Sequence, residues 1–132
     1  MNLKRVVATV TFIGCLGGTV LAQDAGDPAA GEKVFARCRP CHMVGEGAKN
    51  SVGPVLNGVV GRKAGTYPGY PYSEANRNSG LTWDEATLKD YLHAPQQKVK
   101  GTKMVFAGIK NDHEIDDLIA FLKQYDADGK KK

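Results

Sequence analysis

Cysteine and histidine are scarce in this chain, which limits the metal sites that it can form. Among 132 residues there are three of each, namely Cys15, Cys38, Cys41, His42, His93 and His113. A structural zinc site needs four ligands held close together. Cys38, Cys41 and His42 could supply three of them, but no fourth thiol or imidazole lies nearby in the sequence. A zinc module is therefore not favoured.

The chain also lacks a strong excess of charge of either sign. It carries 18 basic and 14 acidic residues, a formal net charge of +4. Without residues 1–22, which contain two basic residues and no acidic one, 16 basic and 14 acidic residues leave a net charge of +2. Nucleic-acid binding would need a larger charge gathered on one element. We therefore expect no nucleic-acid partner.

A long apolar run is missing as well. Two basic residues precede an apolar stretch from Val6 to Leu21, which is short for a bilayer span and is interrupted by glycines and threonines. This pattern, with compact residues before Ala22, is typical of a cleaved secretory signal peptide. We expect residues 1–22 to be removed on export to the periplasm, and residues 23–132 to form one domain without stable membrane insertion. A lipoprotein signal acylated at Cys15 is the alternative.

Five consecutive residues carry the clearest chemical signal, Cys38-Arg39-Pro40-Cys41-His42. Two cysteines separated by two residues and followed by histidine are typical of a c-type haem attachment site. The two thiols would add to the haem vinyl groups, and His42 would bind the iron. A disulfide or a redox-active cysteine pair is the alternative. The redox pair expects a βαβ setting, and no strand pattern precedes Cys38.

The apolar periodicity predicts helices separated by long irregular segments. Asp27 before Pro28 indicates the start of a first helix, which the spacing continues to Cys38. Gly31 inside this helix indicates close approach by another helix, because glycine is otherwise unfavourable there. Further helices are expected from Ser73 to Asn78, from a capping box at Thr82–Glu85 to the residue before Pro95, and from a cap at Asn111 and Glu114 through Leu122.

The remaining segments should lack regular structure. Residues 43–72 are rich in glycine and proline, and residues 96–110 show no periodicity. So long an irregular segment as 43–72 is unusual in a compact domain, but a haem would offer an apolar face for it to wrap. Residues 128–132 have no apolar side chain, and we expect a frayed tail.

A second iron ligand cannot be assigned from these residues alone. His93 and His113 sit among polar residues and are expected to be solvated. Met43 follows His42 directly and cannot reach the opposite face of the haem. Met104 lies in a segment that could cross that face, but simple apolar packing would also suit it. The competing hypothesis is an open sixth site, as in a peroxidase-like or gas-binding haem protein.

Taken together, the sequence resembles the class I c-type cytochromes, the family of cytochrome c2 and mitochondrial cytochrome c. The resemblance covers nearly all of residues 27–128. It rests on Gly31-Glu32-Lys33-Val34-Phe35, Cys38 to His42, Val52-Gly53-Pro54-Val55-Leu56, Gly61-Arg62-Lys63, Tyr72-Ser73-Glu74-Ala75-Asn76, Leu81-Thr82-Trp83, Tyr91-Leu92, Gly101-Thr102-Lys103-Met104-Val105-Phe106-Ala107-Gly108-Ile109-Lys110 and Asp117-Leu118-Ile119-Ala120-Phe121-Leu122. The resemblance implies a small all-α fold whose first and last helices cross, with Gly31 against Leu118 and Phe121, and whose loops wrap one covalently bound haem.

The resemblance also implies roles for individual residues. Met104 would be the second iron ligand opposite His42, and the Pro54 carbonyl would hold the other nitrogen of His42. Two sets of polar residues would surround the haem. Those facing its propionates would be Arg62, Tyr72 and Trp83. Those lying near the methionine would be Asn76, Tyr91 and Thr102.

The chain departs from the family pattern at four positions. Gln96 and Gln97 stand where lysines are frequent, which puts the strength of partner docking in question. Lys100 replaces a usual proline, and Asn50 replaces a histidine that often ties loops together, which puts loop stiffness in question.

The function implied by the resemblance is electron transfer rather than enzymatic catalysis, since both axial positions would be filled. We expect a soluble, monomeric, periplasmic one-electron carrier that takes electrons from a cytochrome bc1 complex. Its exchange partner would be a photosynthetic reaction centre, a terminal oxidase or a periplasmic dehydrogenase. A basic ring is expected around the exposed haem edge, formed by Lys33, Arg37, Lys49, Lys98, Lys103 and Lys110.

Overall fold

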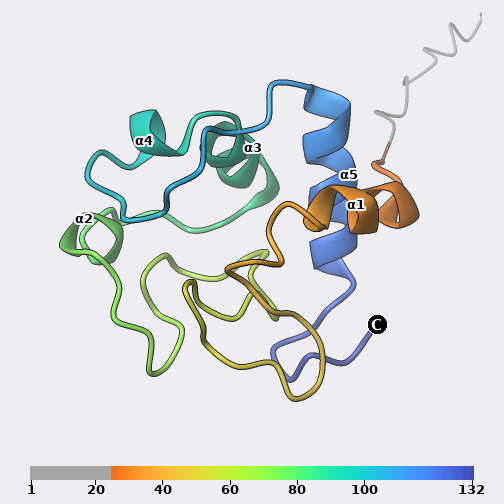
Figure 1. Cartoon of the computed structure of the whole chain (residues 1–132), viewed down its shortest axis with the longest axis horizontal. Coiled ribbons are helices and arrows are strands. Elements are labelled where there is room, and N and C mark those ends of the chain that lie inside the picture. The colour runs from red at the N-terminus through yellow and green to blue at the C-terminus, as the bar shows by residue number, and fades with distance from the viewer. Residues whose placement is uncertain (1–24) are drawn as a thin grey trace, which may run out of the picture.

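The computed structural model describes residues 25–132 and shows an all-α protein (Figure 1). Its helices are α1 (Pro28–Phe35), α2 (Glu74–Arg77), α3 (Glu85–His93), α4 (Pro95–Lys98) and α5 (Asp112–Lys123). Extended pairing within these residues is limited to two isolated bridges, Lys63 with Thr82 and Tyr125 with Lys131. The expected fold class is confirmed, whereas the predicted signal peptide lies outside the described residues. No helix between residues 25 and 132 is long and apolar enough to cross a membrane.

Helix α1 begins where the sequence predicts. The Asp27 carboxylate accepts a hydrogen bond from the Ala29 amide at 2.9 Å, and Pro28 occupies the first helical position, where an N–H would have no helical partner. The helix ends at Phe35, before the expected end at Cys38. Turns then continue the chain to Cys41, so both cysteines of the motif lie outside regular helix.

Helices α1 and α5 cross at Gly31 (Figure 1). A Cβ atom at Gly31 would collide with the carbonyl of Asp117 and lie 2.8 Å from Cβ of Phe121. The interpretation of Gly31 as a helix contact is thus confirmed, with Asp117 rather than Leu118 as its closest neighbour. Beside this contact, the rings of Phe35 and Phe121 pack with centroids 5.2 Å apart. Both rings are buried, and their contact joins the first helix to the last helix in the core.

The caps of α2 and α5 agree with the sequence prediction. Ser73 Oγ accepts a hydrogen bond from the Asn76 amide at 3.1 Å at the start of α2. The side chain of Asn111 accepts one from the His113 amide at 2.9 Å at the start of α5. Each side chain thereby satisfies an amide that has no partner inside its helix.

Helices α3 and α4 differ from the prediction at their ends. The N-cap of α3 is Asp84, which accepts from the Thr87 amide at 2.7 Å, so the predicted capping box beginning at Thr82 is wrong. Thr82 instead pairs with Lys63 in an extended bridge. Helix α4 was not predicted; its first residue, Pro95, is fully buried and suits a helix start because its ring already has a helical φ.

Side chains stabilise the long loop after the cysteine motif. The buried amide of Asn57 accepts from the Gly45 N–H at 2.7 Å and donates to the Gly45 carbonyl at 2.9 Å. The guanidinium of Arg62 donates to the carbonyls of Asn57 at 3.0 Å and Val55 at 3.1 Å. Backbone groups that have no helical or strand partner are thus paired.

The last residues are not the frayed tail that we expected. The Lys132 amide donates to the Gln124 carbonyl at 2.8 Å, and Asp126 accepts from the Asp128 and Lys130 amides at 2.9 Å. Gly129, with φ +82°, is buried so close to Gly45 that a Cβ would collide with its carbonyl group. The chain end therefore packs against the start of the long loop.

Candidate haem-binding site

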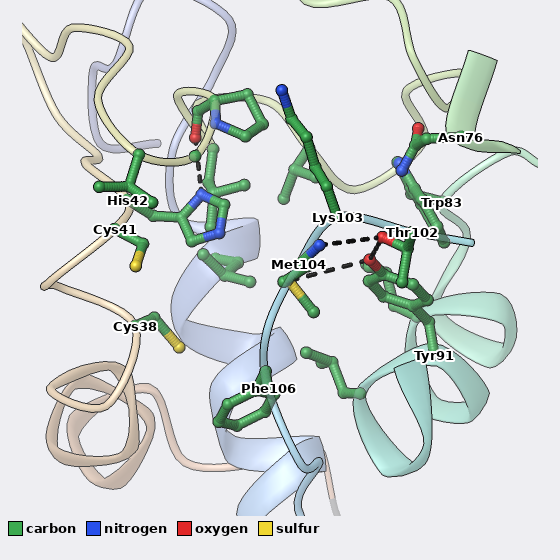
Figure 2. A pocket seen from close by; sticks show the side chains of 18 of the residues that line it. Cys38, Cys41, His42, Asn76, Trp83, Tyr91, Thr102, Lys103, Met104 and Phe106 are labelled. Atoms are coloured by element: carbon green, nitrogen blue, oxygen red, sulfur yellow. Dashed lines mark hydrogen bonds between the residues drawn. The ribbon is translucent and has the colours of Figure 1, made fainter. Parts of the chain in front are cut away.

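A largely apolar pocket lies between the α1–α5 pair, α3 and the long loops (Figure 2). Its apolar wall includes Phe35, Leu56, Val59, Leu88, Leu92, Phe106, Leu118 and Leu122. Figure 2 shows the cysteine motif on one side of the pocket and Met104, Thr102 and Tyr91 on the other. Neither His93 nor His113 lines it, in agreement with their expected solvation.

The two cysteines of the motif reach the pocket from the turns that follow α1. The amides of Cys41 and His42 both donate to the Cys38 carbonyl, at 3.0 and 2.9 Å, and this tight turn brings all three side chains to the pocket wall. Both thiols are free and half-buried. Burial raises the pKa of Cys38 to about 11, against the opposing positive charge of Arg37. The thiol therefore stays protonated at neutral pH in the protein alone.

The imidazole of His42 is oriented by backbone groups of the following loop. Its Nδ1–H donates to the Pro54 carbonyl at 2.7 Å, because a carbonyl can only accept. Burial lowers the pKa of His42, which favours the neutral ring. The lone pair is then on Nε2, the nitrogen needed for metal binding. Gly53 makes room for this ring, since a Cβ there would lie 2.7 Å from Nδ1; sequence reasoning missed this role, although glycine directly before Pro54 was a visible signal.

Polar groups surround the sulfur of Met104. The hydroxyl of Tyr91 donates to Met104 Sδ at 3.8 Å and lies 3.3 Å from Thr102 Oγ1. The same Thr102 oxygen accepts from the Met104 amide at 3.3 Å. Tyr91 and Thr102 are buried, and Met104 packs against the core. These three residues, predicted from resemblance to lie together, form one connected group in the pocket wall.

The other predicted polar residues also line the pocket but use their hydrogen bonds differently. Arg62 is half-buried, and among residues 25–132 no carboxylate forms an ion pair with it. The Tyr72 hydroxyl accepts from the Tyr67 amide at 3.2 Å and keeps its own proton available. Burial lowers the pKa of Arg62 and raises the pKa of Tyr72. Trp83 is buried, and its indole N–H has no hydrogen-bond partner within the described chain.

Asn76 presents another unused polar group. Its side-chain oxygen is buried and has no partner among residues 25–132, although the residue lines the pocket. Because buried polar atoms are normally paired, this atom indicates that the pocket is built to be filled.

The basic residues expected around the haem edge differ in whether their side chains form ion pairs or hydrogen bonds. Arg37 forms a two-pronged ion pair with Glu114 at 2.9 and 3.0 Å, and Lys98 pairs with Asp90 at 2.8 Å. Each of these pairs adds an acidic group to the proposed ring.

Two further lysines of the ring are attached to backbone carbonyls. Lys103 donates to the Pro71 carbonyl with its ammonium 4.5 Å from the centre of the Tyr70 ring, and Lys110 donates to the His93 carbonyl at 2.7 Å. Lys33 and Lys49 are exposed, and neither forms an ion pair or side-chain hydrogen bond within residues 25–132.

The residues present fit a haem. Two free thiols and a neutral imidazole face a pocket with a mainly apolar wall. The half-buried guanidinium of Arg62, which has no carboxylate partner within residues 25–132, suits the negative charge of a propionate, because a charge withdrawn from water is costly unless it is paired. The free indole N–H of Trp83 and the free hydroxyl proton of Tyr72 could donate to the same groups.

Comparisons with known proteins agree with this geometry. The model of the cytochrome c family matches residues 28–126. A cytochrome c2 of Rhodoblastus acidophilus is 61% identical over 107 residues, which cover 81% of this chain and 100% of that protein. A cytochrome c2 of Rhodoplanes tepidamans is 63% identical over 106 residues, covering 80% of this chain and 99% of that protein.

A solved structure supports the same assignment at the level of the fold. Cytochrome cH from Methylobacterium extorquens superimposes with a TM-score of 0.71 at 55% identity, covering 75% of this chain and 99% of that one. The resemblance inferred from the sequence motifs is thereby confirmed. The chain belongs to the cytochrome c family, and it is an electron-transfer protein with covalently attached haem c.

Proposed function

We propose that the protein is a periplasmic one-electron carrier in which Cys38 and Cys41 hold the haem and His42 and Met104 bind its iron. The observation that carries this proposal is that one pocket is lined by both thiols, by the neutral imidazole of His42 and by the thioether of Met104. A bound haem c would supply the one-electron couple of its iron. With both axial ligands drawn from the chain, no position would be left for a substrate.

The proposed ligands would set the redox behaviour of the carrier. A thioether sulfur is a soft ligand that favours the ferrous state, so Met104 would raise the reduction potential. The Pro54 carbonyl, by accepting from His42 Nδ1, would hold the imidazole in one orientation and increase its basicity. The apolar wall would exclude water, and its close packing would allow little rearrangement between the two oxidation states.

The proposed partners follow from likeness to proteins named cytochrome c2 and cytochrome cH. We propose a cytochrome bc1 complex as the electron donor. The acceptor would be a photosynthetic reaction centre or a terminal oxidase, and a periplasmic dehydrogenase is a further exchange partner. The export signal expected in residues 1–22 supports the periplasm as the location.

Removal of Met104 tests the proposed ligation. The oxidised wild-type protein should show the weak far-red charge-transfer band of a sulfur–iron bond. The Met104→Ala variant should lose this band, and its reduced form should bind carbon monoxide. The matched control is Met43→Ala, because Met43 is 44% exposed and does not line the pocket; it should keep the band.

The alternative function, a haem protein with an open sixth site, makes the opposite prediction. Rapid carbon monoxide binding by reduced wild-type protein at neutral pH, together with absence of the far-red band, would establish that alternative.

A further inference from the structure

Gln96, on the short helix α4, contacts the segment that carries Met104. Its side-chain Nε2 donates to the Met104 carbonyl at 3.0 Å and to the Thr102 carbonyl at 3.3 Å. Among residues 25–132, no other group donates to either carbonyl. One amide group therefore spans the two carbonyls that flank Lys103.

Apart from the side chains of Lys103 and Lys110, which donate to the carbonyls of Pro71 and His93, the segment around Met104 has few other attachments. At its start, the Thr102 amide donates to the Val99 carbonyl at 3.0 Å, and at its end the Ile109 amide donates to the Leu92 carbonyl at 2.9 Å. Residues 103–111 form no helix or bridge. Between the two ends, the backbone of Met104 makes two hydrogen bonds within residues 25–132: its N–H donates to Thr102 Oγ1, and its carbonyl accepts from Gln96. Loss of that contact would leave the Met104 carbonyl without a protein partner.

Helix α4 gives Gln96 a fixed position. Pro95 before it is fully buried, and Val99, which ends the turn, is 4% exposed. The short helix is thus anchored in the core at Pro95 and at Val99, while Gln96 itself lies at the surface. The backbone that carries Gln96 is therefore anchored on both sides, and two hydrogen bonds direct its side chain toward the Met104 segment.

We propose that Gln96 is a positioning residue for the sixth iron ligand: its amide holds the backbone of Met104 so that the sulfur stays bound to the iron. This inference rests on the proposed ligation by Met104. It also separates two residues that sequence reasoning treated alike, because Gln97 is exposed and its side chain makes no hydrogen bond within residues 25–132. Gln96 would thus stabilise the bond between the Met104 sulfur and the iron, in addition to any effect on docking of a partner.

The hydrogen-bond donors of Gln96 can be removed by a substitution that keeps the shape of the side chain. A glutamine NH2 group offers two donors, whereas an ionised glutamate of the same shape is an acceptor only. Gln96→Glu would therefore place a carboxylate against two carbonyl oxygens with little change in volume. Gln97→Glu makes the same change in charge one residue away, without the contact, and is the matched control. Gln96→Ala removes the donors without adding charge.

The test is a titration of each oxidised holoprotein with imidazole, which competes with Met104 for the iron. Loss of the far-red band reports displacement of the sulfur, and a denaturant titration gives the free energy of unfolding. We expect imidazole to bind about tenfold more tightly to Gln96→Glu and about threefold more tightly to Gln96→Ala, from the typical strength of such hydrogen bonds. The reduction potential of both variants should fall, and Gln97→Glu should resemble the wild type.

Two results would overturn the proposal. One is equal imidazole affinity for Gln96→Glu and Gln97→Glu, including the case in which Gln96→Glu only lowers the free energy of unfolding. The other is wild-type affinity in Gln96→Ala, because the effect of Gln96→Glu would then be charge repulsion rather than a lost hydrogen bond. Failure of the proposed ligation is distinguishable, since the wild-type protein would then lack the far-red band from the start.

Discussion

The hydroxyl of Tyr91 is the one side-chain donor within residues 25–132 that contacts the sulfur of Met104, at 3.8 Å. Burial raises the pKa of this phenol, so it stays protonated, and able to donate, well above neutral pH. With Met104 bound to the iron as proposed, this hydrogen bond would draw electron density from the sulfur and weaken its donation to ferric iron. Tyr91 should therefore favour the reduced state.

The substitution Tyr91→Phe tests this effect of a single atom. The reduction potential should fall by on the order of 20 to 40 mV, because sulfur accepts only weak hydrogen bonds. A redox titration followed by haem absorbance measures the change. Tyr125→Phe is the control, since Tyr125 lies outside the pocket and its ring packs on Phe121 with centroids 5.5 Å apart. A potential unchanged in Tyr91→Phe, or lowered equally in the control, would contradict the role assigned to this hydroxyl.

The side chain of Asn50 connects two loops. The resemblance put loop stiffness in question because a histidine is frequent at this position. The structure shows that Asn50 accepts from the Val55 amide at 3.0 Å and donates to the Pro68 carbonyl at 3.0 Å. An amide does not titrate near neutral pH, so this connection between two loops is independent of pH.

At the scale of elements, the crossing of α1 and α5 depends on the missing side chain of Gly31. By helix propensity alone, valine should be no worse than glycine. The structure predicts that valine is worse than glycine here. The Asp117 carbonyl and Phe121 lie so close to Gly31 that any Cβ at this position would force the two helices apart.

We therefore expect Gly31→Val to lower the free energy of unfolding by on the order of a few kcal/mol, as overpacking of a core does. Chemical denaturation followed by Trp83 fluorescence or circular dichroism measures the change. Ala29→Val adds bulk to an exposed position of the same helix and should change stability by less than about 1 kcal/mol. Equal stability of both variants would mean that the helices can separate without cost.

Two of the incorrect predictions, the cap of α3 and the frayed tail, share one cause. Thr82 and Asp84 both suit an N-cap, and the bridge between Thr82 and Lys63 leaves Asp84 to start α3. Residues 128–132 lack apolar side chains, but their backbone amides find partners at Asp126 and Gln124. In each case a contact with a distant or folded-back segment selected between local options that were similar in energy.

At the scale of the whole molecule, two members of the expected basic ring are paired with acidic groups, which would reduce the electrostatic field of the ring. Glu114 is bound to Arg37 and Asp90 to Lys98. The side chain of Lys103 also ties its segment to Pro71, so its replacement would change structure and charge together. Glu114 offers a cleaner test, because surface ion pairs contribute only about 0 to 1 kcal/mol to stability.

The substitution Glu114→Gln should speed association with an acidic redox partner, because it leaves the positive charge of Arg37 uncompensated. The gain, about twofold to fivefold at low salt, should shrink as salt rises, since exposed charges are screened over roughly 8 Å at physiological ionic strength. Stopped-flow electron transfer measures the rate. Asp128→Asn makes the same change in net charge in the C-terminal segment and should have a smaller effect. Equal rates for the wild type and Glu114→Gln at every salt concentration would show that docking does not depend on this ring.

The sequence by itself determined the haem chemistry and the fold class of this protein. The attachment motif lies within five consecutive residues, and the main helices are encoded by caps and by apolar residues three and four apart. Such signals are local, so they can be read without knowing what lies nearby in space.

The tertiary structure decided which partners the polar groups find. That Gln96 binds the carbonyl of Met104 while Gln97 binds nothing within residues 25–132 could not be read from two adjacent glutamines. Every residue carries the same backbone carbonyl, so the sequence holds no signal for which one a side chain will meet. The same reason applies to Gly129 beside Gly45 and to the choice of Asp84 as a cap. These contacts exist only once packing of the core has brought distant segments together.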